Sequence, residues 1–373
     1  MSYHFTPAAR RYSIAFGFVF LLGLTSCGGG SDSAVSTTSE PATSPPVLTT
    51  SLTLLAGNVG SVPPLPVNRD GVGSQAFFLD TPTSIALDST GNAYVNDFDG
   101  VRKITPQGAV STILNASAAD FSGAPAWVGL DGENNVYAAY VFSGLADLFI
   151  LDGRAKIIKL SKDGKLTTLW SIGFPYARSI DDTPRFFAVD QRGNLFVAFS
   201  KASDLRVLKL SPEGVVLGEV LVAGMNSATD MLVDPSGQLV IADPGPFSLR
   251  TDPNTGAVVE AARPAVVRRV DPVSGDATTL ATFATAYPVN YYGRMRLAQD
   301  KLGNVYATDP RRHVVYQIQP GGQVSVVVGQ LDSANVVLGV LPGGLHSPQG
   351  IAVDANGLLY IGSSHAILTA KLR

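Results

Sequence analysis

The chain has 373 residues, of which 45% are hydrophobic and 15% are charged, compared with roughly 25% charged residues in an average soluble protein. This composition excludes a disordered chain, and the formal net charge of -3 argues against nucleic acid as a partner, because nucleic-acid-binding domains carry a basic excess. The 38 glycines and 24 prolines favour a turn-rich β protein.

Residues 1–26 have the pattern of an export signal peptide. Arg10 and Arg11 are followed by a largely apolar run of thirteen residues, Tyr12 to Leu24. A membrane-spanning helix needs roughly 20 apolar residues, so this run is too short for a permanent span. A short apolar run after basic residues is typical of a signal that is removed after export.

The residues that follow, Leu24-Thr25-Ser26-Cys27, resemble the lipobox of bacterial lipoproteins. The resemblance implies that Cys27 becomes the lipidated N-terminus and that the lipid anchors the chain to a membrane. In that family, an aspartate directly after the cysteine favours retention in the inner membrane. Gly28 occupies this position here, so the resemblance implies an anchor in the outer membrane, facing the periplasm or the cell surface. Cys27 is the only cysteine and can form no internal disulfide, so the alternative is an incidental thiol.

Residues 27–50 are predicted to form a flexible tether behind the lipidated cysteine. Ser, Thr, Gly and Pro make up 16 of the 23 residues from Gly28 to Thr50, and no apolar periodicity is present. A flexible chain of this length has an end-to-end distance of roughly 26 Å. The folded part, residues 51–373, is therefore expected to stand clear of the lipid.

Six segments of the folded part share one pattern, which consists of an apolar triplet, an aspartate, two further residues, a glycine and an apolar strand. The aspartates are Asp88, Asp131, Asp190, Asp234, Asp300 and Asp354. An aspartate that opens a type I turn caps backbone N–H groups, and glycine or asparagine takes the positive φ that follows. The pattern predicts six hairpins with structural aspartates, and Asn134 replaces the glycine in the second.

Each hairpin is followed by a third strand, and the first five repeats continue into a fourth. The sixth repeat ends at Arg373 without a fourth strand, whereas Ser51 to Gly57 has the pattern of a fourth strand with no hairpin before it. We expect this N-terminal strand to complete the last sheet, because ring closure removes an exposed sheet edge.

Repeats of about 40 to 50 residues with four strands each are typical of β-propellers. The runs Ile85-Ala-Leu-Asp88, Gly91-Asn92, Tyr94-Val95 and Val101-Arg-Lys-Ile-Thr-Pro106 resemble an NHL-repeat propeller, and the resemblance covers essentially all of 51–373. It implies an all-β fold, a six-bladed β-propeller of NHL type whose last blade is closed by the N-terminal strand. His313 and His365 lie where the Asn-His-Leu region of that family enters the third strand, and most repeats here lack this histidine.

The longer connections are expected to emerge on one face of the propeller. They join fourth to first strands (57–82, 171–184, 283–294 and 329–348) or second to third strands (141–155 and 244–265). Long loops in a compact domain are usually functional or mobile, so this face is a candidate binding surface. The alternative is that they are neutral insertions.

Counting four residues back from each repeat aspartate gives the start of each innermost strand. These positions are Ser84, Trp127, Phe186, Asp230, Arg296 and Gly350. With the adjacent Arg185 and Arg294, the residues Trp127, Phe186, Asp230 and Arg296 are predicted to line a binding pocket at the channel mouth, since small-molecule sites combine an apolar wall with a few polar groups. The alternative is a structural ion pair between Asp230 and Arg296 that closes the channel.

Enzyme motifs are mostly absent from the sequence. Propeller lyases and lactonases use clustered histidine or acidic metal ligands, and only His313, His346 and His365 remain after removal of the signal. All three map to the long-loop face, where three histidines could hold a zinc ion. No cofactor is expected, although these histidines leave a metal possible.

The sequence therefore favours a membrane-anchored extracytoplasmic propeller lipoprotein that acts as a scaffold for an unknown protein or small-molecule ligand. It is expected to be a monomer, held to the membrane through Cys27, with no nucleic-acid partner. One alternative is a propeller enzyme of the lyase or lactonase type with a metal-assisted site, and another is a purely structural envelope protein.

Overall fold

The computed structural model describes residues 50–60, 68–98, 100–115, 125–141, 155–172, 184–201, 203–225, 227–244, 249–251, 258–260, 264–286 and 294–372. The predicted signal peptide 1–26, Cys27 and the tether as far as residue 49 lie outside them. Leu48–Arg373 forms one compact unit. None of the helices within the described ranges is long and apolar enough to cross a membrane.

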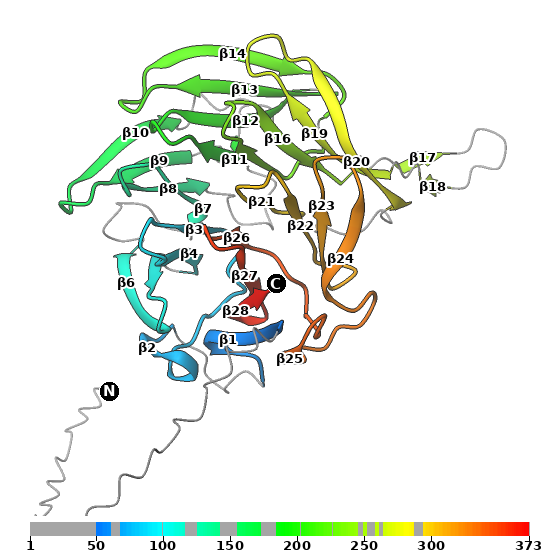
Figure 1. The fold of residues 1–373 in the computed structure, drawn as a ribbon. Helices are drawn as coiled ribbons and strands as arrows, with labels where there is room; N and C mark the ends of the chain where they lie inside the picture. The colour runs from blue at the N-terminus through cyan, green and yellow to red at the C-terminus, as the bar shows by residue number, and fades with distance from the viewer. Residues whose placement is uncertain are drawn as a thin grey trace, which may run out of the picture. The chain divides into compact units, whose positions relative to one another are not determined.

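In the described part of the chain, six antiparallel sheets form the blades of a β-propeller (Figure 1). Blade 1 contains β3 (Ile85–Leu87), β4 (Ala93–Asp97), β5 (Gly100–Ile104) and β6 (Ala109–Asn115). Blade 2 contains β7 (Pro125–Leu130), β8 (Val136–Val141), β9 (Ala155–Leu160) and β10 (Leu166–Ile172). Blade 3 contains β11 (Pro184–Val189), β12 (Leu195–Lys201), β13 (Asp204–Leu210) and β14 (Val216–Val222). Blades 4 and 5 contain β15 (Asp230–Val233), β16 (Leu239–Asp243), β19 (Pro264–Val270) and β20 (Ala277–Ala286), and then β21 (Leu297–Gln299), β22 (Val305–Asp309), β23 (Val314–Ile318) and β24 (Val324–Gly329). The predicted six-bladed, all-β fold is confirmed.

Blade 6 confirms the predicted ring closure. It contains β26 (Ile351–Val353), β27 (Leu358–Ser363) and β28 (His365–Lys371), and its fourth strand is the N-terminal β1 (Ser51–Asn58). Strand β1 runs antiparallel to β28, with Ser51 opposite Lys371 and Asn58 opposite His365. The first and last strands of the folded unit therefore share one sheet.

The hairpin turns form as the repeat pattern predicts. In all six, one carboxylate oxygen of the aspartate accepts the backbone N–H groups two and four residues later. Asn134 has a φ of 64°, and the equivalent Gly91 has a φ of 84°. The interpretation of these aspartates as structural residues is confirmed.

Hydrophobic side chains fill the spaces between neighbouring blades. One cluster joins Tyr94 and Val101 of blade 1 to Val128 and Ile158 of blade 2. Because each sheet uses both of its faces for such contacts, the inner edge of the first strand is what remains to face the propeller axis. Figure 1 shows the first strands around the centre of the ring and the fourth strands at its outside.

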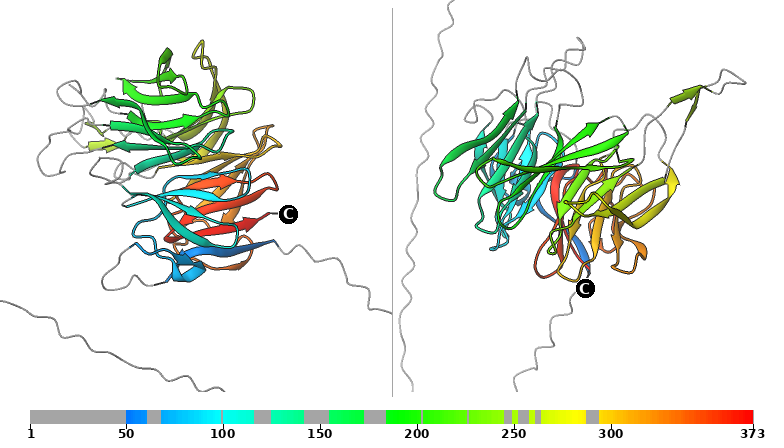
Figure 2. Two further views of the ribbon diagram at one scale, coloured as in Figure 1. Left: turned by 90° about the vertical axis from the view of Figure 1, so that its left-hand side faces the viewer. Right: turned by 90° about the horizontal axis from the view of Figure 1, so that it is seen from above.

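Several elements differ from the sequence expectation. The short strands β2 (Gly71–Val72) and β25 (Gly339–Val340) add a fifth strand to blades 1 and 6, and a 3-10 helix covers Gly73–Gln75. Within the expected loop 244–265, β17 (Leu249–Thr251) pairs with β18 (Val258–Glu260), and this pair stands out from blade 4 (Figure 2). Strand β20 extends to Ala286, into the expected loop 283–294. Much of the other long connections lies outside the described residues, so the predicted loop-face surface stays a prediction.

Candidate ligand site at the channel mouth

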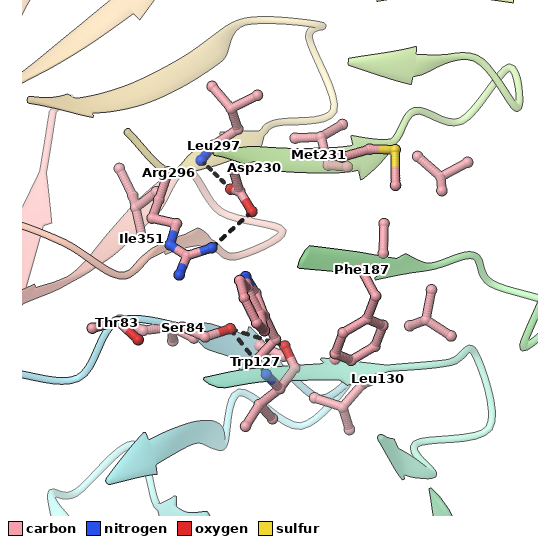
Figure 3. A pocket seen from close by; sticks show the side chains of 18 of the residues that line it. Thr83, Ser84, Trp127, Leu130, Phe187, Asp230, Met231, Arg296, Leu297 and Ile351 are labelled. Carbon is pink, nitrogen blue, oxygen red and sulfur yellow. Dashed lines mark hydrogen bonds and ion pairs between the residues drawn. The ribbon is translucent and has the colours of Figure 1, made fainter. Parts of the chain in front are cut away.

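A cavity of about 230 Å³ lies between the first strands at the centre of the propeller. All first strands run in the same direction along the axis, so equivalent residues lie at the same depth. Thr83, Ser84, Trp127, Asp230 and Arg296 line one end, and Leu130 lies toward the other end (Figure 3). The equivalent positions of three other first strands also line the cavity with apolar side chains, those of Leu87, Val189 and Val233. The cavity therefore has a polar mouth and an apolar floor.

The positions found by counting back from the repeat aspartates share one strand face, and that face points at the next blade. Ser84 Oγ in blade 1 accepts the N–H of Val128 at 3.0 Å and donates to the Val128 carbonyl at 3.1 Å. A Cβ added to Gly350 would lie 2.9 Å from Ile85 of the following blade. Side chains alternate between the two faces of a strand, and in a propeller both faces are interfaces between blades.

Phe186 shows most clearly that this strand face points at the next blade and not at the axis. It is 1% exposed and belongs to the core cluster that also contains Met225 and Met231. It is not among the residues that line the cavity. The structure therefore places Phe186 in the core between blades 3 and 4, whereas Trp127, at the equivalent position of blade 2, lines the mouth.

Asp230 and Arg296 form a buried ion pair between blades 4 and 5. Arg296 Nη1 lies 3.2 Å from Asp230 Oδ1, and Asp230 Oδ2 accepts the N–H of Leu297 at 2.8 Å. Asp230 is 9% exposed and Arg296 is 3% exposed. Burial raises the pKa of Asp230, and the Arg296 charge opposes this rise. The ion pair that the sequence left as an alternative therefore exists.

Trp127 brings blade 2 into contact with blade 5, on the opposite side of the ring. The Arg296 guanidinium carbon lies 5.2 Å from the centre of the Trp127 ring, and that of Arg294 lies 5.6 Å from it. Both distances are within the range of cation–π attraction. In Figure 3 the indole points toward Arg296 and Asp230. These contacts gather Trp127, Asp230, Arg294 and Arg296 at the mouth.

Arg294 lies at the mouth, where part of its side chain is exposed to solvent and the guanidinium group is crowded by its neighbours. Loss of water around its guanidinium group, together with repulsion from Arg296 and Arg185, lowers its pKa to about 10. It therefore stays protonated at neutral pH. Arg185, exposed at the start of β11, is close enough to act on this charge, so the charged groups that shift the pKa of Arg294 are both cations.

Three buried N–H groups at the mouth have no hydrogen-bond partner among the described residues. They are Trp127 Nε1, Arg296 Nε and Arg296 Nη2. Most buried polar groups in proteins are hydrogen-bonded, so each exception needs an explanation. Trp127 and Arg296 are both among the mouth residues predicted from their positions four residues before a repeat aspartate. No sequence signal could show that their donors lack acceptors, since this depends on contacts across the ring.

The three candidate metal-binding histidines divide between two places. The His313 and His346 rings stack with centroids 5.8 Å apart, and His313 Nδ1 accepts the N–H of Ser347 at 3.0 Å. His365 instead stacks on Phe77 and places Nδ1 3.0 Å from the Phe78 carbonyl oxygen. Within the described part of the chain, no three His, Cys, Asp or Glu side chains form a group that could hold a metal ion.

No protein-family model matches the chain, and no curated protein matches it by sequence. Among solved structures, it is similar to a protein of unknown function from Bacteroides thetaiotaomicron, with 15% identity, 86% of this chain and 75% of that chain covered, and a TM-score of 0.61. An auxiliary nutrient binding protein from the same species gives 12% identity, coverages of 86% and 76%, and a TM-score of 0.59.

A gluconolactonase from Xanthomonas campestris is also similar, with 13% identity, coverages of 79% and 87%, and a TM-score of 0.51. Binding proteins and an enzyme thus share this architecture, and a shared fold at such low identity does not transfer a function. The likeness establishes the fold, a six-bladed β-propeller of the kind that the NHL-like repeats indicate.

Proposed function

We propose that the chain is a membrane-anchored extracytoplasmic binding protein whose propeller takes a small ligand at the channel mouth. The anchor and the location rest on the export signal and the lipobox-like residues before Cys27. The ligand site rests on the mouth and its cavity.

The observation that carries the site is the set of unpartnered donors on Trp127 and Arg296. A buried donor without an acceptor destabilises a protein by about 1–3 kcal/mol. A ligand that brings acceptor atoms to the mouth would form these missing hydrogen bonds. Removal of the penalty would then make the free energy of binding more favourable. A pocket with apolar walls and a few convergent polar groups is the usual form of a small-molecule site.

The size of the cavity limits the ligand. Pockets for drug-sized molecules have volumes of about 300–1,000 Å³, and this cavity has about 230 Å³. The ligand, or the part of it that enters the channel, is therefore small. The auxiliary nutrient binding proteins of similar fold support the choice of nutrient-sized molecules for a first screen, by analogy of fold alone.

Tryptophan fluorescence tests the proposal directly. The chain has two tryptophans, and Trp170 lies on the outer strand β10, edge-on to Phe199 at 6.0 Å. In a Trp170→Phe protein, Trp127 is the sole reporter. A screen of small acids, sugars, phosphates and neutral metabolites should find compounds that change its emission saturably.

The reciprocal variant is the control. In a Trp127→Phe protein the same compounds should leave the emission of Trp170 unchanged. If calorimetry detects binding of a compound that alters neither tryptophan, the ligand site lies elsewhere on the propeller. If no compound in the screen changes the emission of Trp127, the proposed function is wrong.

A further inference from the structure

Building on the proposed function, we infer that the mouth recognises a monocarboxylate with a short apolar tail. The carboxylate binds at the arginines of the mouth, and the tail extends along the apolar channel. Three observations lead to this ligand class, namely the free edge of Arg296, the charge around Arg294 and the polarity of the cavity.

The hydrogen bonds of Arg296 leave one edge of its guanidinium unused. Nη1 donates to Asp230 Oδ1 at 3.2 Å and to the Thr229 carbonyl at 3.4 Å. The buried atoms Nε and Nη2 have no partner among the described residues. Their two N–H bonds are nearly parallel, which is the arrangement that binds both oxygens of a carboxylate. A neutral amide offers only one acceptor oxygen to this edge.

The charge at the mouth favours a single anion. The positive charges of Arg185 and Arg296 act on the Arg294 guanidinium group, and Asp230 forms its ion pair with Arg296. Exposed Arg294, stacked on Trp127, meets an incoming anion first. Arg296 is 3% exposed, so it engages the ligand after the Trp127 indole turns aside. The Trp127 N–H then supplies a further donor.

The cavity behind the mouth favours an apolar tail. Beyond the polar end, its walls include Ile85, Leu130, Phe187 and Met231. The channel follows first strands of three to six residues, each residue adding about 3.3 Å. This wall offers little to the hydrated oxygens of inorganic phosphate, and it gains contact with each methylene of an alkyl chain.

Titration of the Trp170→Phe protein with matched probes tests this inference. The probes are acetate, butyrate, hexanoate, octanoate, hexanamide and inorganic phosphate, at constant ionic strength because salt screens exposed charges. Hexanoate should bind at least tenfold more tightly than hexanamide or phosphate. Affinity should rise about fourfold per added methylene until the chain fills the channel.

Two substitutions locate the carboxylate. Arg294→Gln removes an exposed charge and should weaken hexanoate binding about tenfold, while hexanamide binding stays the same. Arg296→Lys keeps the charge but removes the two-pronged edge. It should reduce the preference for hexanoate over hexanamide without abolishing it, because the positive charges at positions 294 and 296 remain. A thermal melt of each variant establishes that it is folded. The matched control is Arg206→Gln, since Arg206 also stacks on an aromatic ring, Phe199 at 4.8 Å, away from the mouth.

The outcomes separate the two proposals. If hexanamide binds as tightly as hexanoate, or phosphate binds more tightly, the mouth is a ligand site but the carboxylate class is wrong. If none of these probes binds while another compound changes the emission of Trp127, the class is likewise wrong and the proposed function stands. Equal effects of Arg294→Gln and Arg206→Gln on hexanoate binding would also overturn the inference.

Discussion

The Asp131 carboxylate holds the inner hairpin of blade 2 together. It accepts hydrogen bonds from the backbone N–H groups of Glu133 and Asn135, the Asn135 side-chain amide and the Tyr137 hydroxyl. Burial by itself would raise the pKa of Asp131, but these hydrogen bonds, led by those from Asn135, lower it below its ordinary value of 3.8. The charged form is therefore the one that stabilises the turn.

Asp131→Ala should destabilise the propeller by about 1–3 kcal/mol at pH 7, because it leaves buried donors without an acceptor. A carboxyl with a lowered pKa contributes stability above its unfolded pKa, and this contribution is lost as the pH falls through the folded pKa. The difference between wild type and variant should therefore shrink in acid below the ordinary pKa. Urea unfolding at pH 7, 5 and 3 measures it. Glu133→Ala, at an exposed position of the same turn, is the control, and an equal effect would contradict the role of Asp131.

Arg102 is a buried cation that connects blade 1 to the segment before it. It is 1% exposed, with Nη1 at 2.9 Å from Asp97 and Nη2 at 3.0 Å from Asp70. The same guanidinium group donates to the carbonyl oxygens of Arg69 and Phe77. One side chain thereby satisfies acceptors on two separate stretches of backbone.

Arg102→Met should destabilise the protein by about 3–5 kcal/mol, because Asp97 would remain buried without its partner. Arg206→Met is the comparison, since the Arg206–Glu219 pair has a separation of 3.8 Å and is partly exposed. Such pairs contribute only about 0–1 kcal/mol. Chemical denaturation of the two variants tests the difference, and similar losses would mean that Arg102 does not anchor this segment.

At the scale of the element, β1 closes the ring. Leu52 and Ala56 of β1 are fully buried, and the hydroxyl groups of Thr53 and Thr369 are 2.8 Å apart. Loss of the strand exposes the edge of β28 and the apolar residues that β1 covers. Unpaired sheet edges promote aggregation.

A chain that begins at Val59 should therefore melt at a lower temperature than one that begins at Thr50, and should scatter light on heating. As a point test, Leu52→Ala should cost about 2–5 kcal/mol, and Leu54→Ala, at a partly exposed position, should cost less. Identical melting of the two truncated chains would show that closure of the ring does not depend on β1.

The elements that could be predicted from sequence are those that local chemistry determines. The Asp88 turn needs only residues within its own hairpin, and the same holds in all six repeats, so counting repeats was enough for the blades and their closure. The two-residue strands β2 and β25 could not be predicted, because they form only where a neighbouring sheet offers an edge. The alternation of side chains along a strand likewise predicts that Trp127 and Phe186 lie on equivalent faces of their first strands. It does not predict what surrounds each side chain, because that depends on the residues that the next blade places opposite it.

At the scale of the whole molecule, the charge balance bears on how the chain is held at a membrane. Removal of residues 1–26 takes away Arg10 and Arg11 and changes the formal net charge from -3 to -5. A negative protein is repelled by anionic lipid, and juxtamembrane basic residues are what usually provide electrostatic attachment. The predicted attachment therefore depends on the lipid at Cys27.

Cys27→Ala should release the protein from the membrane into the soluble export fraction, because it removes the only cysteine, which is the residue predicted to carry the lipid. Fractionation of cells, with incorporation of labelled fatty acid, measures the change. Ser33→Ala, in the same predicted tether, should leave the protein in the membrane fraction. A wash with 1 M salt should not release the wild type, since salt at this concentration screens interactions between charges more than about 3 Å apart and does not weaken the insertion of acyl chains. Persistent membrane association of the Cys27→Ala protein would show that another part of the chain provides the attachment.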